Sequence, residues 1–154
     1  MSIEEAQAIV ASHGVDLTRP FITQVSRFDP WKDPLGVIEC FEMLRKKHPT
    51  LQLVMLGNFA DDDSEGMVMY KKVVKAASRL QDIHIITGLT DMVGPFQLLS
   101  DVVLQKSTRE GFGLTVTEAL WKATPVVAGA VGGIRLQIPG GRGKVPGEQR
   151  GRMR

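Results

Sequence analysis

Hydrophobic residues recur along this chain in two alternating patterns, short continuous runs and stretches with helical spacing. Five apolar or β-branched runs predict strands, and they span residues 20–25, 51–57, 82–87, 101–107 and 124–129. Five helical stretches lie around them, and they span residues 2–13, 35–47, 66–80, 92–100 and 113–122. Apolar strands that alternate with helices are typical of a parallel sheet with helices on both faces.

The predicted helix at residues 35–47 shows the helical pattern most clearly. Val37, Ile38, Phe41 and Leu44 fall on one of its sides. We expect that side to be buried against the sheet.

Two prolines and two tryptophans lie near the ends of predicted elements. Pro30 and Pro34 are interpreted as breakers that keep the segment around them in a loop. Trp31 and Trp121 are expected to pack against the domain rather than to stack on a ligand.

The alternation predicts a Rossmann-like, doubly wound α/β fold with strand order 3-2-1-4-5. Crossovers between parallel strands are right-handed in nearly all proteins, which leaves few other topologies. In this order the sequence of strands reverses between the first and the fourth, and ligands bind outside the carboxyl ends of strands at such a point. We therefore expect the loops after residues 20–25 and 101–107 to line one crevice.

The loop after the fourth predicted strand carries two glutamates around a pair of glycines. Glu110 lies at the strand exit and is followed by Gly111 and Gly113. Glu118 lies inside the next helix. A carboxylate suits sugar hydroxyls, and a glycine backbone at a helix N-terminus can approach phosphate oxygens closely. This pattern predicts a site for a phosphorylated sugar.

The loop after the first predicted strand carries two cations. Arg27 and Lys32 lie there in the segment SRFDPWKDP, and together they suit a diphosphate. Considered alone, Arg27 and Lys32 are interpreted as solvated surface charges, and the same holds for Glu110 and Glu118. Their expected meeting at one switch point favours a shared ligand over four unrelated charges.

Composition and charge exclude several classes of protein. The 154 residues fit one domain, and 43% hydrophobic residues are ordinary for a globular core. The net charge is +2, but residues 139–154 sum to +4 and the remainder to −2, so the body offers no basic face for nucleic acid. Cys40 is the one cysteine, which excludes an intramolecular disulfide and favours the cytoplasm. No apolar run reaches the roughly 18 residues of a membrane span.

Two segments resemble a known enzyme family in detail. SRFDPWKDP and STREGFGLTVTEALWKATPVVAG, with the later VGGI, are similar to retaining nucleotide-sugar glycosyltransferases of family four, which have the GT-B fold. The similarity covers about residues 14–138 and corresponds to the C-terminal, donor-binding domain of that fold. The FDPWKDP and EALWK details resemble the trehalose-forming members of the family more narrowly.

The resemblance implies a role for each motif. Arg27 and Lys32 would hold the donor diphosphate and stabilise the departing nucleotide. Glu110 would face the transferred glucose, and Glu118 would hydrogen-bond the ribose hydroxyls. The donor would also contact the turn between them, at Gly111, Phe112, Gly113, Leu114 and Thr115.

The reaction that the resemblance implies is transfer of glucose from a nucleoside diphosphate glucose with retention of configuration, here to free glucose to give trehalose. No metal and no further cofactor are expected, because the two cations would neutralise the diphosphate. His13, His48 and His84 also lack the spacing of metal ligands. Glu110 is not assigned as a nucleophile, because the family is thought to react on one face of the sugar without one.

Three further glycines are candidates for the donor side of the site. Gly57 ends the second predicted strand, and Gly132 and Gly133 follow the fifth. Glycine at such places serves either a turn alone or the close approach of the backbone to a ligand. Both interpretations stay open for these positions.

The chain divides into three expected parts. Residues 1–13 form a helix or linker, residues 14–138 the nucleotide-sugar domain, and residues 139–154 a basic Gly/Arg-rich tail that we expect to be disordered. The family's acceptor-binding N-terminal domain would precede this segment, and a sixth strand with closing helices would follow it. Without them the fifth strand would be an open edge, so we expect limited stability and self-association through that edge.

Three classes of function follow from these features. The first is the donor half of a glycosyltransferase, trehalose-forming or with another acceptor, and inactive without its partner domain. The second is a non-enzymatic remnant that binds nucleotide sugars, which the intact motifs equally allow. The third, nucleic-acid binding through the arginine-rich tail, is disfavoured by the acidic body of the chain and its lack of interleaved aromatic residues.

Overall fold

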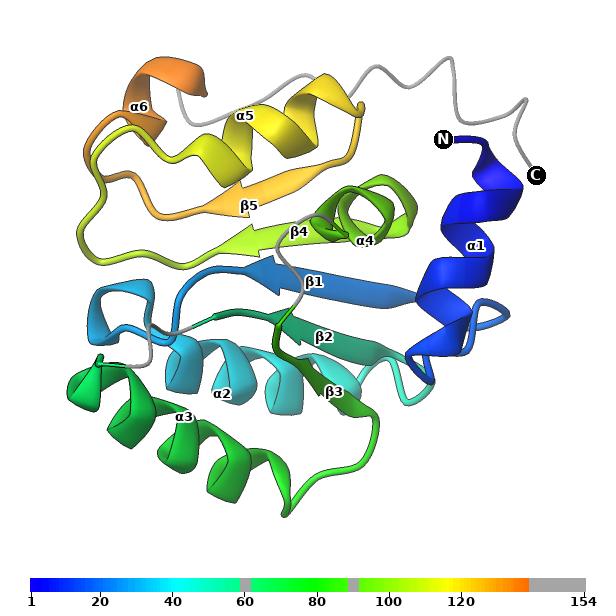
Figure 1. Cartoon of the computed structure of the whole chain (residues 1–154), viewed down its shortest axis with the longest axis horizontal. Helices are drawn as coiled ribbons and strands as arrows, with labels where there is room; N and C mark the ends of the chain where they lie inside the picture. Colours follow the sequence, from blue (N-terminus) through cyan, green and yellow to red (C-terminus); the bar gives the residue numbers. More distant parts are fainter. Residues whose placement is uncertain (59–61, 89–91, 139–154) are drawn as a thin grey trace.

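Five parallel strands form the centre of the structure, a computed structural model that describes residues 1–58, 62–88 and 92–138 (Figure 1). The strands are β1 (Phe21–Val25), β2 (Gln52–Leu56), β3 (Ile83–Ile86), β4 (Val102–Gln105) and β5 (Val126–Ala128). The helices are α1 (Ile3–Ser12), α2 (Pro34–Arg45), α3 (Ser64–Ala77), α4 (Val93–Leu99), α5 (Leu114–Trp121) and α6 (Ile134–Gln137), with a 3₁₀ turn η1 (Pro30–Lys32).

The order of the strands in the sheet is β3-β2-β1-β4-β5. Each neighbouring pair is parallel, and β1 at the centre pairs Ile22 with Leu53 on one side and with Val102 on the other. The predicted 3-2-1-4-5 order of an α/β doubly wound sheet is therefore confirmed. All five strands end at the same edge of the sheet (Figure 1).

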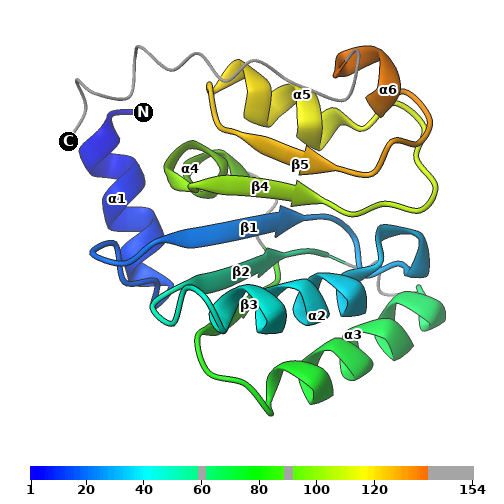
Figure 2. The ribbon, with the colours of Figure 1, turned by 180° about the vertical axis from the view of Figure 1, so that it is seen from behind.

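Apolar residues on both faces of the sheet hold the helices in place. Successive strand residues point to opposite faces, so Leu53 joins Phe41 in the cluster beneath α2 and α3, whereas Val54 joins Val10 and Phe96 in the cluster beneath α1 and α4. Figures 1 and 2 show these helix pairs on the two sides of the sheet. The sheet is thus buried on both faces near its centre, as its continuous apolar strands predict.

Aspartates and prolines start two helical turns at the carboxyl edge of the sheet. Asp33 caps α2, whose first residue is Pro34, and Asp29 caps η1, whose first residue is Pro30. Proline suits a first turn because its fixed φ is already helical and its missing N–H would have no partner there. The predicted loop around these prolines therefore contains a 3₁₀ turn, and α2 begins at Pro34, one residue before its predicted start.

Three other details differ from the sequence prediction. Val37, Ile38 and Phe41 are buried as predicted, but Leu44 in the last turn of α2 is 38% exposed. Trp121 is 90% exposed and does not pack against the domain, in contrast to the prediction. The short helix α6 was not predicted, because its four residues are too few to show a hydrophobic period.

The fifth strand is one of the two outer strands of the sheet as far as the structure describes it. Its central residue, Val127, is 62% exposed. The predicted open edge stays a prediction, because it and the expected disorder of residues 139–154 depend on residues outside the described part. Among the described helices, none combines the length and the apolar character that crossing a membrane requires.

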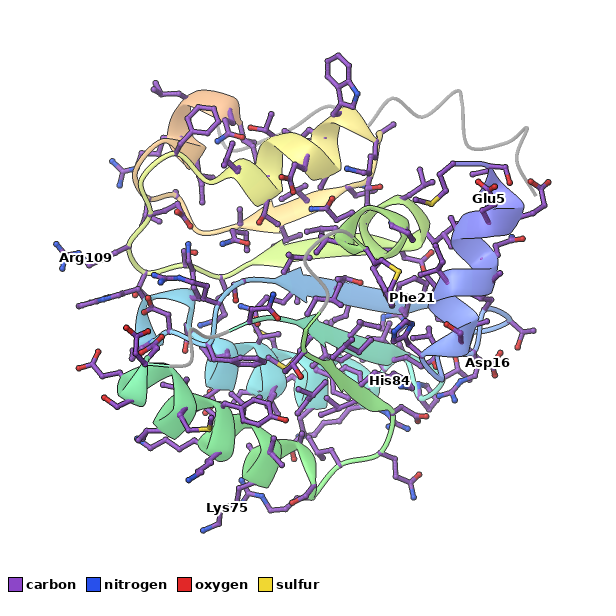
Figure 3. All side chains as sticks on the ribbon, viewed as in Figure 1. Glu5, Asp16, Phe21, Lys75, His84 and Arg109 are labelled. Atoms are coloured by element: carbon purple, nitrogen blue, oxygen red, sulfur yellow. The ribbon has the colours of Figure 1, made fainter. Side chains whose placement is uncertain are left out.

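An ion cluster lies before β3, at the amino edge of the sheet. Nη1 of Arg19 donates to Oδ1 of Asp82 at 2.9 Å. The other carboxylate oxygen, Oδ2, lies 2.9 Å from Nη2 of Arg19 and 3.0 Å from Nη1 of Arg45. These guanidinium groups hold the pKa of Asp82 below its ordinary value, with the hydrogen bond from Arg19 contributing most and burial opposing it. The charge of His84, on β3 and labelled in Figure 3, adds to the lowering of this pKa.

Asp82→Asn removes this negative charge and keeps a residue type that tolerates the observed φ of 64°. We expect a lower melting temperature at pH 7, because two guanidinium groups lose their carboxylate partner. A lowered folded pKa means that the stabilisation is present above the unfolded pKa of about 3.9 and is lost as the pH falls through the folded value. Thermal melts of both proteins at several pH values measure this, and the gap between them should close on acidification.

Glu42→Gln is the matched control for that experiment, because Glu42 is an exposed carboxylate on α2. It should change the free energy of unfolding by no more than about 0.5 kcal/mol. Equal stability of the Asp82 variant and the wild type at pH 7, or a gap that widens on acidification, would contradict the role of the cluster.

Candidate functional site

The loops that follow β1 and β4 lie side by side at the carboxyl edge of the sheet (Figures 1 and 2). Parallel pairing of Gln24 with Leu104 brings the two strand ends together. The expected convergence of the cation loop and the glutamate loop is therefore observed, although Lys32 and Glu110 are 78 positions apart in the sequence.

An ion pair joins the two loops directly. Nζ of Lys32 lies 2.5 Å from Oε2 of Glu110, and their side chains are only 20% and 11% exposed. The same carboxylate oxygen accepts hydrogen bonds from Oγ of Ser107 at 3.1 Å and from Nε2 of Gln105 at 3.3 Å. The other oxygen, Oε1, accepts one from the backbone N–H of Gly111 at 3.2 Å.

These contacts decide the charge of Glu110. Burial by itself would raise the pKa of the carboxyl group, but the hydrogen bond and the charge of Lys32 lower it, helped by Ser107 and Gln105, and the net shift is downward. Glu110 is thus an ionised carboxylate at neutral pH. A group held in this state accepts hydrogen bonds well and is a poor general acid.

Further contacts join the loop after β1 to the loop after β4. The backbone N–H of Thr108 donates to the carbonyl of Trp31 at 2.8 Å, and the Arg109 guanidinium lies 4.7 Å from the centroid of the Trp31 ring. Lys106 forms an ion pair with Asp33, the residue that caps α2. Figure 3 shows Arg109 at this edge of the molecule. Trp31 therefore contacts the neighbouring loop while remaining 50% exposed, and its packing role in preference to stacking on a ligand stays a prediction.

The second predicted cation is placed differently. Arg27 lies on the same loop as Lys32, but its side chain is 69% exposed and its Nη2 is 3.5 Å from Asp29. Lys32 is more firmly anchored, because the buried side chain of Gln24 donates from Nε2 to its backbone carbonyl at 2.9 Å. The structure thus joins Lys32 to Glu110 and leaves Arg27 extended from the rim of the same loop.

Helix α5 begins beside this ion pair. Gly113 is its N-cap, with a φ of 82° and no side-chain cap among the described contacts. The first N–H groups of a helix lack partners within the helix and attract anions. Phe112 and Leu114 are exposed at 56% and 65%, while Oγ1 of Thr115 donates to the carbonyl of Val25 at the end of β1. The predicted turn therefore presents a helix N-terminus directly over the switch point.

The three additional candidate glycines all lie against the backbone of these loops. A Cβ on Gly132 would come within 1.8 Å of the Glu110 carbonyl oxygen, and Gly133 donates its N–H to the carbonyl of Gly111 at 2.6 Å. A Cβ on Gly57 would come within 2.3 Å of the Ser26 carbonyl oxygen. Close backbone approach explains glycine at each position, and their contact with a ligand stays a prediction.

The second glutamate of the pair lies on α5 and contacts a different helix. Nε2 of Gln97, on α4, donates to Oε2 of Glu118 at 3.0 Å. Glu118 is otherwise exposed. The structure thus leaves it accessible to a ligand, and its predicted role toward ribose stays a prediction.

Several residues that shape the site were not predicted. They are the buried Gln105 and Ser107 behind Glu110, Gln97 behind Glu118, and Gln137 of α6, whose Nε2 donates to the carbonyl of Phe112 at 2.5 Å. Their common signal is a polar residue inside or beside an apolar run, which suggests a buried partner. The sequence does not show which partner that is. Within residues 1–58, 62–88 and 92–138, no three potential metal ligands gather, and independence from metals stays a prediction.

Comparison with protein families and curated proteins gives consistent matches. The family model described as "Glycosyl transferases group 1" matches residues 5–142. A trehalose synthase from Rubrobacter xylanophilus is 52% identical over 147 residues, which is 93% of this chain and 35% of that protein. A trehalose synthase from Thermococcus litoralis is 50% identical over 132 residues, which is 83% of this chain and 32% of that protein. The chain therefore spans about a third of the length of these relatives.

Solved structures share the fold. A glycosyltransferase from Rickettsia africae superposes with a TM-score of 0.77 at 24% identity, over 90% of this chain and 36% of that chain. The Anabaena protein Alr3699/HepE, in complex with UDP-glucose, superposes with a TM-score of 0.73 at 21% identity, over 90% of this chain and 37% of that chain. At these identities the likeness establishes the arrangement of strands and helices.

Gly132→Ala tests whether the loop after β5 supports the turn that carries Glu110. Gly132 has a φ of 50°, so an alanine there combines backbone strain with a clash against the Glu110 carbonyl. We expect the free energy of unfolding to fall by more than about 1 kcal/mol and the amide NMR signals of residues 110–112 to shift. Chemical denaturation and a two-dimensional amide spectrum measure the two effects.

Gly14→Ala is the matched control for that substitution. Gly14 has a φ of 85°, and a Cβ there would meet no atom closer than 3.8 Å, from the ring of His84. It should therefore show the backbone strain without any change at residues 110–112. If Gly132→Ala leaves those signals in place, the loop after β5 does not support the turn.

Proposed function

The chain belongs to the glycosyl transferases group 1 family, and on that premise we propose that it binds the nucleoside diphosphate sugar of a retaining glucosyl transfer. The ion pair between Lys32 and Glu110 carries this proposal. It places a cation and an ionised carboxylate, from loops far apart in sequence, beside the N-terminus of α5. A diphosphate binds to a cation and to a helix N-terminus, and sugar hydroxyls bind to a carboxylate.

The diphosphate would lie between Lys32 and the first N–H groups of α5, with Arg27 closing from the exposed rim. An ammonium group has three donors, and Lys32 uses one of them on Glu110. The remaining donors suit phosphate oxygens. Positive charge aimed at the departing nucleoside diphosphate stabilises the charge that develops there, and one such donor is commonly worth about 3 kcal/mol of barrier.

Glu110 would orient the transferred glucose by accepting hydrogen bonds from its hydroxyl groups. Three donors already surround Oε2, whereas Oε1 accepts from the adjacent backbone N–H of Gly111. A carboxylate engaged in this way is a weak nucleophile, which is consistent with retention by attack and departure on one face of the sugar. Glu118 would hold the ribose hydroxyls.

The names of the relatives support particular substrates. Trehalose synthases that match this chain support trehalose as the product, for which free glucose would be the acceptor, and the Anabaena complex with UDP-glucose supports a nucleoside diphosphate glucose as the donor. Because the chain spans about a third of those synthases, the acceptor would bind in a domain beyond this segment. The single cysteine fits a cytoplasmic location.

A non-enzymatic nucleotide-sugar-binding remnant, or a transferase with another acceptor, would use the same donor site. Assays for glucosyl transfer by this chain, alone and with an acceptor domain supplied in trans, distinguish these functions. Transfer to glucose supports the trehalose-forming reaction, transfer to another sugar supports a different acceptor, and binding without transfer supports the remnant.

Calorimetric titration with UDP-, ADP- and GDP-glucose tests the donor site and ranks the bases. We expect Lys32→Ala and Arg27→Ala each to weaken binding of the preferred donor at least about tenfold, because a hydrogen bond to a charged group contributes roughly 1.5–3 kcal/mol. Melting curves confirm that each variant is folded.

Lys75→Ala is the control, since Lys75 is an exposed lysine of α3 at a distance from both loops (Figure 3). It should bind the donor as the wild type does. Wild-type affinity in both the Lys32 and the Arg27 variants would rule out the diphosphate contact.

A further inference from the structure

A buried side chain on α4 holds Glu118. Gln97 is 1% exposed, and its Nε2 donates to Oε2 of Glu118 at 3.0 Å. Its Oε1 accepts from Nζ of Lys122, also at 3.0 Å. The three side chains form a continuous chain of hydrogen bonds between α4 and the C-terminal half of α5.

The lysine decides which way the amide of Gln97 faces. An ammonium group can only donate, so the amide oxygen must face Lys122 and the amide nitrogen must face the carboxylate of Glu118. Lys122 is itself fixed, because its Nζ also donates to the backbone carbonyl of Glu118 at 3.2 Å. The reverse orientation would set N–H groups against an ammonium and an oxygen against a carboxylate. The network therefore has one satisfied arrangement.

The backbone of Gln97 is fixed as well. Oγ1 of Thr124 donates to the Gln97 carbonyl at 2.7 Å, and Thr124 is 1% exposed just before β5. Gln97 is thus held at its backbone by Thr124 and at its side chain by Lys122. A donor that is fixed at both ends can fix the group to which it donates.

A glutamine in this position needs a reason, because burying an amide is unfavourable unless its hydrogen bonds are made. An apolar side chain of similar shape would tie α4 to α5 by packing alone, often at no loss of stability. The amide also orients an otherwise exposed carboxylate, because it donates to one particular oxygen of that group. Long side chains such as glutamate lose rotamer freedom when they bind a ligand, and a fixed partner removes that freedom beforehand.

We propose that Gln97 is a positioning residue that holds Oε2 of Glu118 so that Oε1 is aimed at the ribose hydroxyls of the nucleotide. This inference rests on the proposed function, in which Glu118 binds ribose. Gln97 itself does not touch the ligand. Its effect should therefore appear in how strongly the protein distinguishes a ribose from a sugar without those hydroxyls.

Calorimetric titration with UDP and with 2′,3′-dideoxy-UDP measures that distinction. We expect the wild type to prefer UDP at least about tenfold, as a charge-assisted hydrogen bond allows. Gln97→Met keeps the volume and removes the donor. It should lower the preference by at least about threefold, while the affinity for dideoxy-UDP changes by less than about twofold.

The double variant shows whether Gln97 acts through Glu118. Glu118→Ala should abolish the preference for UDP, and adding Gln97→Met should change nothing further, because residues that act through one contact are not additive. If Gln97→Met does not fold, Lys122→Met serves instead. It frees the amide to rotate and should also lower the preference.

Equal weakening of UDP and dideoxy-UDP binding by Gln97→Met would show a merely structural role and overturn the inference, as would an unchanged preference. A wild type that binds UDP without any preference would overturn the ribose contact of Glu118 and the inference with it. A wild type that binds neither nucleotide would overturn the proposed function itself.

Discussion

The partly buried ion pair between Lys32 and Glu110 is the contact on which the arrangement of the site depends. Removing a carboxylate and an ammonium from water is unfavourable unless each has a partner, so neither loop can move without exposing or orphaning a charge. Parallel pairing of β1 with β4 brings the loops together, and the ion pair sets their final separation. Trp31 and Arg109 add a second contact between the same two loops, which water screens more readily.

Three buried glutamines hold the charged residues of the site in place. Gln24 anchors the backbone of Lys32, Gln105 supports Glu110, and Gln97 supports Glu118. Each is at least 98% buried and sits at a strand end or on the helix behind the site. An amide offers a donor and an acceptor without a charge, so it orients a charged neighbour at less desolvation cost than another ion would.

The sheet and the meeting of Lys32 with Glu110 could be predicted from the sequence, because apolar runs fix the strands and the handedness of crossovers fixes their order. The supporting glutamines could not, since the partner of a buried amide depends on tertiary packing. Leu44 and Trp121 were misjudged for a related reason: the face of a helix can be read from its period, but how far the sheet extends beneath it cannot. The roles of the site residues toward a ligand remain proposals that rest on this geometry.

Mapping amide chemical-shift changes in the ¹⁵N-labelled chain on addition of UDP-glucose tests the central claim most directly. If Lys32 and Glu110 grip one nucleotide sugar, the largest changes should fall in residues 26–33 and 110–115, which only the folded sheet brings together. Changes confined to one of these loops, or to α2 and α3, would contradict the account.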